Sequence, residues 1–254
     1  MADKSFLDWP FFEARHRDLA ERLDAWAGAE LGGIDHSDVD AACRELVTAL
    51  GRDGWLEHSG AEGDARLDVR TLCLIRETLA RHDGLADFAF AMQGLGTGAI
   101  SLFGTQDQKD EWLPQTRSGK ALSAFALTEP QSGSDVANST MTATLDGEDY
   151  VLNGEKTWIS NGIKGGCFAL LVKTDPKAEP RYKGMSLMIA PKGEGFGVGK
   201  KFDKLGYKAI DSAELTFDNY RIPADNLIGM EEGNGFFQAT GGLELGRINV
   251  AARG

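Results

Sequence analysis

The chain has 254 residues, 42% of them hydrophobic and 26% charged, which is enough for one large domain or two smaller ones with real cores. Its formal net charge of -12 argues against nonspecific binding to nucleic acid. The first residues, MADKSFLDWP, lack a basic region followed by an apolar core, and no apolar run approaches the roughly eighteen residues that span a bilayer. We therefore expect no export signal, no membrane anchor and a cytoplasmic protein.

The cysteines and histidines give no sign of a metal centre. Cys43, Cys73 and Cys167 are far apart in the sequence and do not have metal-ligand spacing. Reduced, partly buried thiols in a reducing compartment are the simplest interpretation. The four histidines are equally scattered, and surface or helix-capping roles suit them better than ligation. We predict no metal site.

The residues before Lys120 have a helical pattern. Apolar residues recur at helical spacing in three groups: Leu19, Leu23 and Trp26; Leu46, Val47 and Leu50; Leu72, Ile75 and Leu79. The segment from Ala86 to Phe103 is apolar nearly all round and is interrupted by three glycines, which predicts a helix that is buried on most sides and closely approached by a neighbour. Residues 1–119 are therefore predicted to form a helical domain.

After Lys120 the period of the apolar residues changes from helical spacing to two. The predicted strands are Leu122 to Leu127, Met141 to Leu145, Tyr150 to Lys156, Phe168 to Thr174, Met185 to Ala190 and Ala213 to Arg221. They indicate a β-barrel-like domain over residues 120–232. Helical spacing resumes from Gly235, so residues 233–254 are predicted to open a further helical domain. The expected fold class is α+β.

Two segments in the second half carry the chemistry. The first, FALTEPQSGSD from Phe125 to Asp135, leaves a strand and enters a small-residue loop where Gly133 permits close backbone approach and Ser134 adds a donor for a phosphate oxygen. The second, NGEKTWISNG from Asn153 to Gly162, places an aromatic surface beside a hydroxyl at a strand end, as a flavin ring requires. Taken alone, each segment is ambiguous, because a Gly-Ser-Asp loop is more often an ordinary turn and a tryptophan at a strand end usually belongs to the core.

Together, the two segments resemble the acyl-CoA dehydrogenase family, whose members are flavoenzymes that desaturate acyl-CoA thioesters between the α and β carbons. The resemblance continues in LFGT from Leu102 to Thr105, in KLGYKAIDSAELTFDNYRIPADNLIG from Lys204 to Gly229, and in GLELGRINVAARG at the end of the chain. It is weakest before about Asp68. It implies the amino-terminal helical domain and the middle β-domain of this family, with only the start of the carboxy-terminal helical bundle.

The resemblance also assigns FAD as the cofactor and gives roles to residues of the first segment. The backbone at Phe125 and Leu127 and the hydroxyl of Thr128 are expected to meet the isoalloxazine ring. Gly133 and Ser134 are expected along the loop nearest the pyrophosphate, with Ser134 also reaching the CoA side.

In the second segment, the resemblance implies that Trp158 packs on the ring and that Ile159 and Ser160 make contacts near flavin N5. On the last helical segment, Glu244 occupies an acidic position near the CoA moiety, with Arg247 as its helical neighbour. Solvated helix charge is the competing interpretation for both of these residues.

The catalytic base is not identified. Most branches of the family place a glutamate in the bundle, which would lie beyond residue 254, and a minority place it immediately before the arginine equivalent to Arg247, where this chain has Gly246. Glu244 is roughly 200° away around a helix and is no natural replacement. Glu129 lies inside the first motif, but its place before Pro130 suggests that it fixes the loop.

The implied function is an FAD-dependent acyl-CoA dehydrogenase of fatty acid metabolism that forms a trans-2-enoyl-CoA. A carboxylate base would remove the α-proton, a hydride would leave the β-carbon for flavin N5, and an electron-transfer flavoprotein would receive the electrons. Intact members of the family are homodimers or homotetramers. Two alternatives stay open: a flavin oxidase or monooxygenase of the same architecture, and a truncated flavin- or CoA-binding module without activity.

Overall fold

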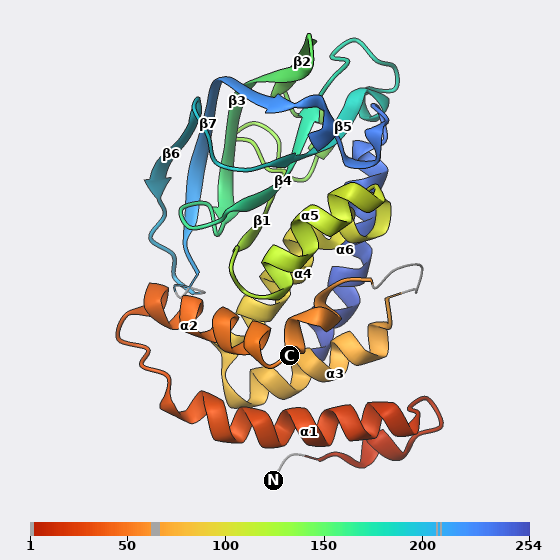
Figure 1. The fold of residues 1–254 in the computed structure, drawn as a ribbon, viewed down its shortest axis with the longest axis vertical. Coiled ribbons are helices and arrows are strands. Elements are labelled where there is room, and N and C mark those ends of the chain that lie inside the picture. The colour runs from red at the N-terminus through yellow and green to blue at the C-terminus, as the bar shows by residue number, and fades with distance from the viewer. Residues whose placement is uncertain (1–2, 62–66, 207, 209) are drawn as a thin grey trace.

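A computed structural model describes residues 3–61, 67–206, 208 and 210–254, and it places a group of helices against one end of a curled sheet (Figure 1). The helices before the sheet are α1 (Ala14–Glu30), α2 (Val39–Arg52), α3 (Val69–His82), α4 (Gly84–Phe103) and α5 (Gln106–Arg117). They pack around fully buried residues that recur at the helical spacing of the sequence, including Leu23, Leu46, Leu50, Ile75 and Leu79. Their burial removes a large apolar area from water and holds this layer together.

Helix α4 joins the helical layer to the sheet. Asp83 caps its first turn by accepting hydrogen bonds from the backbone N–H groups of Leu85 and Ala86. In its middle, a Cβ added at Gly96 would come within 2.6 Å of the Ala124 backbone nitrogen, so only glycine allows this approach. The neighbouring Gln93 accepts a hydrogen bond from the Ser123 N–H at 2.9 Å. The helix therefore fixes where the first strand begins.

In the part of the chain that the structure describes, seven strands form one sheet in the order β1-β4-β2-β3-β7-β6, with β5 paired to β4. The strands are β1 (Ser123–Ala126), β2 (Thr142–Asp146), β3 (Asp149–Ser160), β4 (Cys167–Lys173), β5 (Met185–Ala190), β6 (Phe196–Lys201) and β7 (Ser212–Pro223). The β1–β4 and β2–β4 pairs are parallel, and the other pairs are antiparallel. One face of the sheet encloses its own apolar core, and the other packs against α4, α5 and α6.

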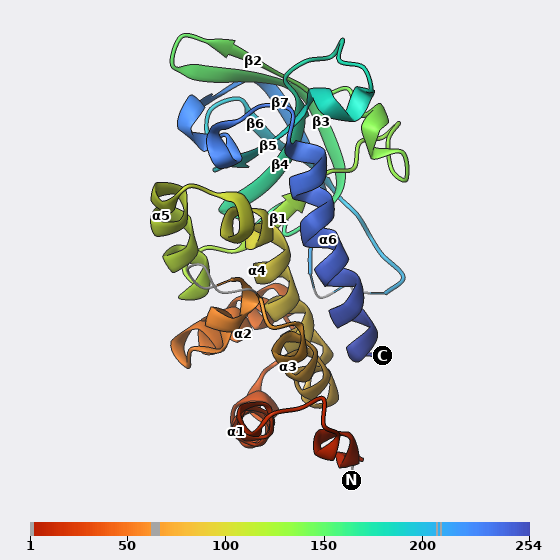
Figure 2. The same cartoon turned by 90° about the vertical axis from the view of Figure 1, so that its right-hand side faces the viewer.

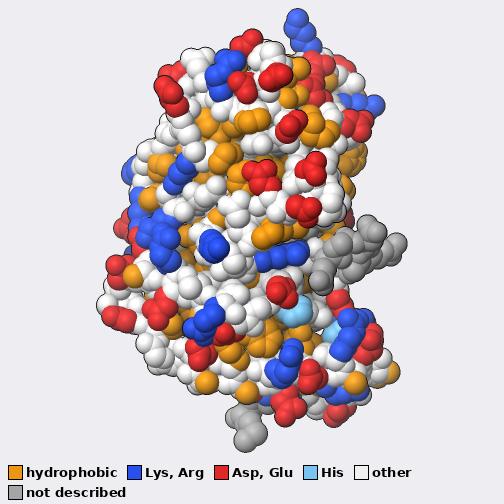
Figure 3. Space-filling model, in the orientation of Figure 1, with side chains coloured by type: hydrophobic (Ala, Val, Ile, Leu, Met, Phe, Trp, Pro, Cys, Tyr) orange, Lys and Arg blue, Asp and Glu red, His pale blue; other side chains and the backbone are white. Residues whose placement is uncertain are grey.

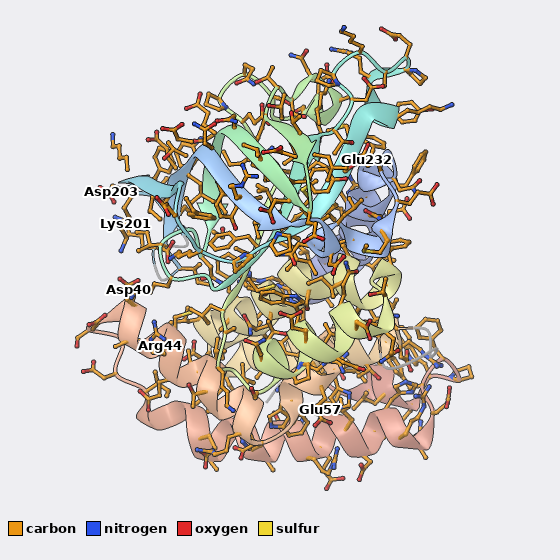
Figure 4. The ribbon with its side chains drawn as sticks, turned by 45° about the horizontal axis from the view of Figure 1, so that its top comes forward. Asp40, Arg44, Glu57, Lys201, Asp203 and Glu232 are labelled. Carbon is orange, nitrogen blue, oxygen red and sulfur yellow. The ribbon has the colours of Figure 1, made fainter. Side chains whose placement is uncertain are left out.

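The last helix, α6 (Gly235–Ala252), starts beside the sheet and passes α4 to reach α3 (Figure 2). A polar contact ties the two layers at another point, where Lys201 at the end of β6 donates to Asp40 at the start of α2 at 3.3 Å (Figure 4). Figure 3 shows acidic and basic side chains interspersed over one face of the molecule. Among the described residues, no helix has the length and apolarity needed to cross a membrane.

The predicted fold class is confirmed: a helical region is followed by a curled sheet and then by the start of another helix. Of the predicted strands, Met185–Ala190 has the observed limits, while β3 continues past its predicted end to Ser160. The sequence analysis missed β6, whose FGVGKK sequence has two glycines and two exposed lysines in place of apolar alternation. The three domain limits remain predictions.

Candidate functional site

The two sequence motifs meet at the ends of β1 and β3. The Thr157 N–H donates to the Thr128 carbonyl at 2.9 Å, and the Lys156 ammonium donates to the Leu127 carbonyl at 3.0 Å. These bonds hold the chain leaving β1 against the last residues of β3. Residues that are about thirty positions apart in the sequence therefore share one rigid surface.

A buried ion pair lies beneath this surface. The side chains of Lys156 and Glu129 are 0% and 1% exposed, and their Nζ and Oε1 atoms are 2.8 Å apart. The Glu129 carboxylate also accepts the N–H groups of Thr140 at 2.6 Å and Met141 at 3.2 Å. Such extra hydrogen bonds are what allow a charged pair to remain in a dry interior.

Both partners of this pair have shifted pKa values. Burial alone would raise the pKa of Glu129, but the Lys156 charge and the hydrogen bonds to its carboxylate hold that pKa below its ordinary value. Burial lowers the pKa of Lys156, against the opposing effect of the Glu129 charge. Glu129 is therefore an ionised anchor for the loop after β1, as the sequence suggested, and it has no access to the cavity described below.

Trp158 is turned out of the sheet by an irregularity in β3. The register between β3 and β7 shifts between Lys156 and Ile159, and Trp158 in the middle has a φ of 59°. Left-handed backbone is strained for a bulky residue, and such strained residues cluster at functional sites. The indole is 55% exposed and stacks on Phe202, with ring centroids 3.9 Å apart. A flat aromatic surface is thus displayed beside the joined motifs, while Ile159 is buried in the core of the sheet.

The small-residue loop after β1 is preorganised at its base and open at its tip. Glu129 and Ser132 exchange backbone hydrogen bonds, and the Ser132 hydroxyl donates to the Asp135 carbonyl at 2.7 Å. Gly133 and Ser134 at the tip are exposed, and a Cβ added at Gly133 would meet no atom within 4 Å. The loop therefore has room for a ligand against its backbone.

A cavity of about 660 Å³ lies between α3, α4, α6 and the open end of the sheet. Its wall is mainly apolar, and α4 contributes the largest share, including Phe88, Phe90, Met92 and Leu95. Ser160 and Ser212 line it at the end of the sheet, while Arg76 and Arg253 line it among the helices. A pocket of this size, apolar with a few polar groups, is typical of a small-molecule site.

The predicted site residues are distributed unevenly around this cavity. Ser160 and Arg247 line it, and Gly246 does so too. Glu244 is exposed on α6 and is absent from the described cavity wall. Phe125, half-buried on β1, and the Leu127–Thr128 backbone belong to the neighbouring joined motifs.

No carboxylate side chain is found in the cavity wall, as far as the described residues show. The described residues also include no group of three or more histidine, cysteine, aspartate or glutamate side chains arranged to hold a metal ion. Cys43, Cys73 and Cys167 are free, and burial raises the pKa of Cys43 to about 11 and that of Cys167 to about 12. These thiols are poor nucleophiles at neutral pH.

Two residues that matter here were not singled out from the sequence. Lys156 was placed at the end of a predicted strand without a role, although its neighbours in the motif were assigned. Arg76 has the sequence context of an ordinary helix charge, yet its side chain is only 4% exposed. A lysine in one of two paired motifs and an acid in the other are a usable signal, but nothing local to Arg76 indicates its burial.

Comparison with known proteins gives consistent matches over both layers. Residues 13–120 match the family model of the acyl-CoA dehydrogenase N-terminal domain, and residues 124–220 match that of the acyl-CoA dehydrogenase middle domain. A probable acyl-CoA dehydrogenase of Mycobacterium leprae is 35% identical over 247 residues, which cover 94% of this chain and 62% of that protein. The chain thus spans less than two thirds of that relative's length.

Solved structures agree with the sequence matches. The acyl-CoA dehydrogenase from Geobacillus kaustophilus matches with a TM-score of 0.83 and 32% identity, covering 96% of this chain and 65% of that one. The acyl-CoA dehydrogenase complexed with FAD from Bacillus anthracis matches with a TM-score of 0.82 and 31% identity, covering 100% of this chain and 45% of that one. The similarity therefore extends to the arrangement of both layers and α6.

Proposed function

Because this chain belongs to the acyl-CoA dehydrogenase family, we propose that it carries the flavin- and acyl-binding parts of an FAD-dependent dehydrogenase that converts an acyl-CoA thioester to a trans-2-enoyl-CoA. The observation that supports this most is that Lys156 and Thr157 join the two motifs, one of which continues to Ser160 in the wall of a largely apolar cavity.

The residues present fit FAD. An exposed indole at Trp158 offers a ring-stacking surface, the Thr128 hydroxyl and the backbone of Phe125 and Leu127 offer polar edge contacts, and the open loop at Gly133 and Ser134 offers N–H groups for phosphate oxygens. When bound, FAD accepts the hydride that leaves the β-carbon of the substrate. We propose that Ile159 contributes backbone contacts only, because its side chain is buried in the sheet.

In this proposal the rest of the chain binds and orients the thioester. The apolar wall from α4 excludes water from the acyl chain, which strengthens electrostatic interactions at the reacting carbons. Ser160 supplies a hydroxyl at the cavity rim, and Ser134, Glu244 and Arg247 contact the CoA portion. Gly246 leaves space instead of a base, so the glutamate that removes the α-proton belongs to the carboxy-terminal bundle of the family, beyond residue 254.

The partners also follow from the family resemblance. We propose that an electron-transfer flavoprotein takes up the electrons, that the intact protein is a homodimer or homotetramer, and that it works in the cytoplasm. The missing carboxylate in the described cavity wall favours one competing function, a flavin- or CoA-binding module without activity.

Titration under anaerobic conditions tests these functions. Binding of FAD to the purified chain would be followed by quenching of flavin fluorescence, and acyl-CoA esters would then be added while the visible absorbance of the flavin is recorded. Because the proposed base lies in the carboxy-terminal bundle of the family, bleaching is expected only when that bundle is supplied, and it would then support a dehydrogenase. Bound flavin that never bleaches even with the bundle present would support the binding module. Trp158→Ala is expected to weaken FAD binding, whereas Trp9→Ala, which removes another exposed tryptophan, is the matched control. Absence of FAD binding to folded protein would contradict the proposal.

A further inference from the structure

A lysine reaches the cavity at the end near the sheet. Lys204 lies in the segment between β6 and β7, and it lines the cavity together with Ser160 and Ser212. The Lys204 ammonium donates hydrogen bonds to the Ile210 carbonyl at 2.6 Å and to the Ser212 hydroxyl at 2.9 Å. An ammonium group has three donors, so these two bonds leave one N–H for a ligand.

The positive charge of Lys204 is not balanced by an ion pair in the part of the chain that the structure describes. Asp211 is the acid whose charge acts on it, and the Asp211 carboxylate accepts the Ile163 N–H at 2.8 Å. Burial lowers the pKa of Lys204, and the charge of Asp211 opposes this shift without reversing it. A partly buried cation of this kind is stabilised when negative charge enters the space beside it.

The segment that holds Lys204 is fixed against the second motif. The Phe202 N–H donates to the Ser212 carbonyl at 2.8 Å, and the Phe202 ring stacks on Trp158. Ser212 is also the partner of Ser160 in the register between β3 and β7. Residues opposite each other in antiparallel strands have Cα atoms about 4.5–5.5 Å apart. The Lys204 ammonium is therefore bonded to the cross-strand neighbour of Ser160.

The other cations of the described cavity wall come from the helices. They are Arg76 on α3 and Arg247 and Arg253 on α6. Arg76 and Arg253 share the Asp87 carboxylate, with nitrogen–oxygen distances of 2.7 Å and 3.1 Å. Among the described residues, Lys204 is thus the cation that the sheet side contributes to the cavity, which is the side where the joined motifs lie.

We propose that the Lys204 ammonium raises the reduction potential of the flavin bound at the joined motifs. The inference rests on the proposed function, because it takes these motifs as the FAD site. Transfer of a hydride to a neutral flavin ring adds one negative charge to the ring, so a cation beside it stabilises the reduced form more than the oxidised form. A mainly apolar cavity wall screens this attraction only weakly. Lys204 therefore favours the uptake of hydride.

The midpoint potential of the FAD-loaded chain, measured by anaerobic equilibration with a redox dye, tests this inference. Lys204→Met removes the charge and both hydrogen bonds. We expect the equilibrium constant for reduction to fall about tenfold, which makes the potential about 30 mV more negative for a two-electron couple. Lys204→Gln keeps a donor without the charge and should shift the potential in the same direction. Lys204→Arg keeps the charge and should retain the native potential.

Controls separate the charge from a structural role. Lys200→Met removes an exposed lysine of β6 that does not line the cavity, so the potential should stay unchanged. A role in folding alone would change stability or FAD affinity equally for the oxidised and reduced forms and would leave the potential where it is. If Lys204→Met does not fold by circular dichroism, Lys204→Gln must show the more negative potential instead.

Two results would overturn the inference alone: equal potentials in the native chain and in the variants without the charge, or a shift that Lys200→Met reproduces. Absence of FAD binding to the folded native chain would overturn the proposed flavin site as well.

Discussion

Two buried ion pairs, one beneath the joined motifs and one among the helices beside the cavity, differ in what surrounds them. Beneath the joined motifs, the Glu129 carboxylate accepts hydrogen bonds from backbone N–H groups and the Lys156 ammonium donates to a backbone carbonyl. At the helical end, Arg76 keeps donors toward the cavity while Asp87 is hidden behind it. The first pair, which we call the closed pair, is bonded to protein groups away from the cavity and stabilises the fold of the loops around it. The second pair is open toward the cavity through Arg76.

Breaking the closed pair should have the largest effect on the fold. Lys156→Met leaves the Glu129 carboxylate buried without its counter-ion, which we expect to lower the free energy of unfolding by about 3–5 kcal/mol. Urea denaturation checks this, with Lys200→Met at an exposed lysine of β6 as the control, expected to stay within about 0.5 kcal/mol of the native chain. A change at Lys156 as small as that of the control would show that the pair is not an anchor.

The same substitution also tests whether the closed pair shapes the flavin site. Lys156 is bonded to the Leu127 carbonyl, so its loss should weaken FAD binding even at temperatures where the variant remains folded. Adding Glu129→Gln removes the unpaired charge and keeps an acceptor for the N–H groups of Thr140 and Met141. The double variant should regain part of the lost stability, and absence of any such coupling would contradict the assignment.

Lowering the pH should weaken the Glu129–Lys156 pair, but it should destabilise the fold less than Lys156→Met does. The pKa of Glu129 is lower in the folded chain than its ordinary value, so its contribution to stability is complete above about pH 4.3 and is lost as pH falls through the lower, folded-state pKa. The effect should be smaller than that of Lys156→Met, because a protonated carboxyl still accepts hydrogen bonds. The stability advantage of the native chain over Glu129→Gln should therefore shrink between about pH 6 and about pH 3.

This difference measurement cancels the other acids of the chain. Asp24 and Asp68 in the helical layer also have lowered pKa values, Asp24 through its hydrogen bonds to Lys4 and His82, and Asp68 through hydrogen bonds that outweigh the opposing effect of burial. Both titrate in the native chain and in Glu129→Gln alike. A stability difference that stays constant across this pH range would mean that Glu129 is not the titrating group.

Substitution at the contact between α4 and β1 should have the next largest effect on stability. A Cβ at Gly96 would come within 2.6 Å of the Ala124 nitrogen, so Gly96→Ala must push α4 away from β1 and should cost about 1–3 kcal/mol of unfolding free energy. Gly98, two residues later on the same helix, meets no atom within 4 Å and lines the cavity. Gly98→Ala should stabilise the helix by about 0.5–1 kcal/mol, since alanine is the better helix former. Thermal unfolding of both variants measures this contrast.

The two glycine variants should also differ in ligand binding. Gly98→Ala places a methyl group in the cavity and should lower the affinity for longer acyl chains more than for shorter ones. Gly96→Ala displaces the start of β1 and should weaken FAD binding instead. If both variants weakened the two ligands equally, α4 would not separate the acyl wall from the flavin surface as we propose.

The sequence predicted the end of the cavity near the sheet better than the helical end. The motif around Thr128 and that around Trp158 have local signatures, a strand that breaks into a small-residue loop and a strand with an aromatic end, so they could be recognised from residue types in order. The union of Arg76 with Asp87 has no such signature, because the partners come from different helices and each has the pattern of a solvated charge. Only the packing of α3 against α4 removes them from water.

The strand irregularity at Trp158 could not be predicted from the sequence either, because a register shift depends on the partner strand β7 and not on β3 alone. Ile159 illustrates the consequence. The sequence assigned it a contact beside Ser160, but alternation around the shift buries its side chain in the sheet and turns Trp158 out. Local pattern therefore predicts which segments form the site, whereas side-chain direction at an irregularity requires the tertiary structure.

A substitution at Trp158 can separate a contribution to the stability of the fold from a contribution to ligand binding. Trp158→Gly removes the stacking on Phe202, which contributes about 0.5–1.5 kcal/mol, but glycine also relieves a left-handed backbone that costs a bulky residue about 1–2 kcal/mol. These effects offset each other, so the unfolding free energy should change by less than about 1 kcal/mol. FAD affinity should fall clearly in the same variant, because the exposed ring is lost. Strong destabilisation with unchanged FAD affinity would assign the indole to the fold and leave the flavin surface to the backbone of the joined motifs.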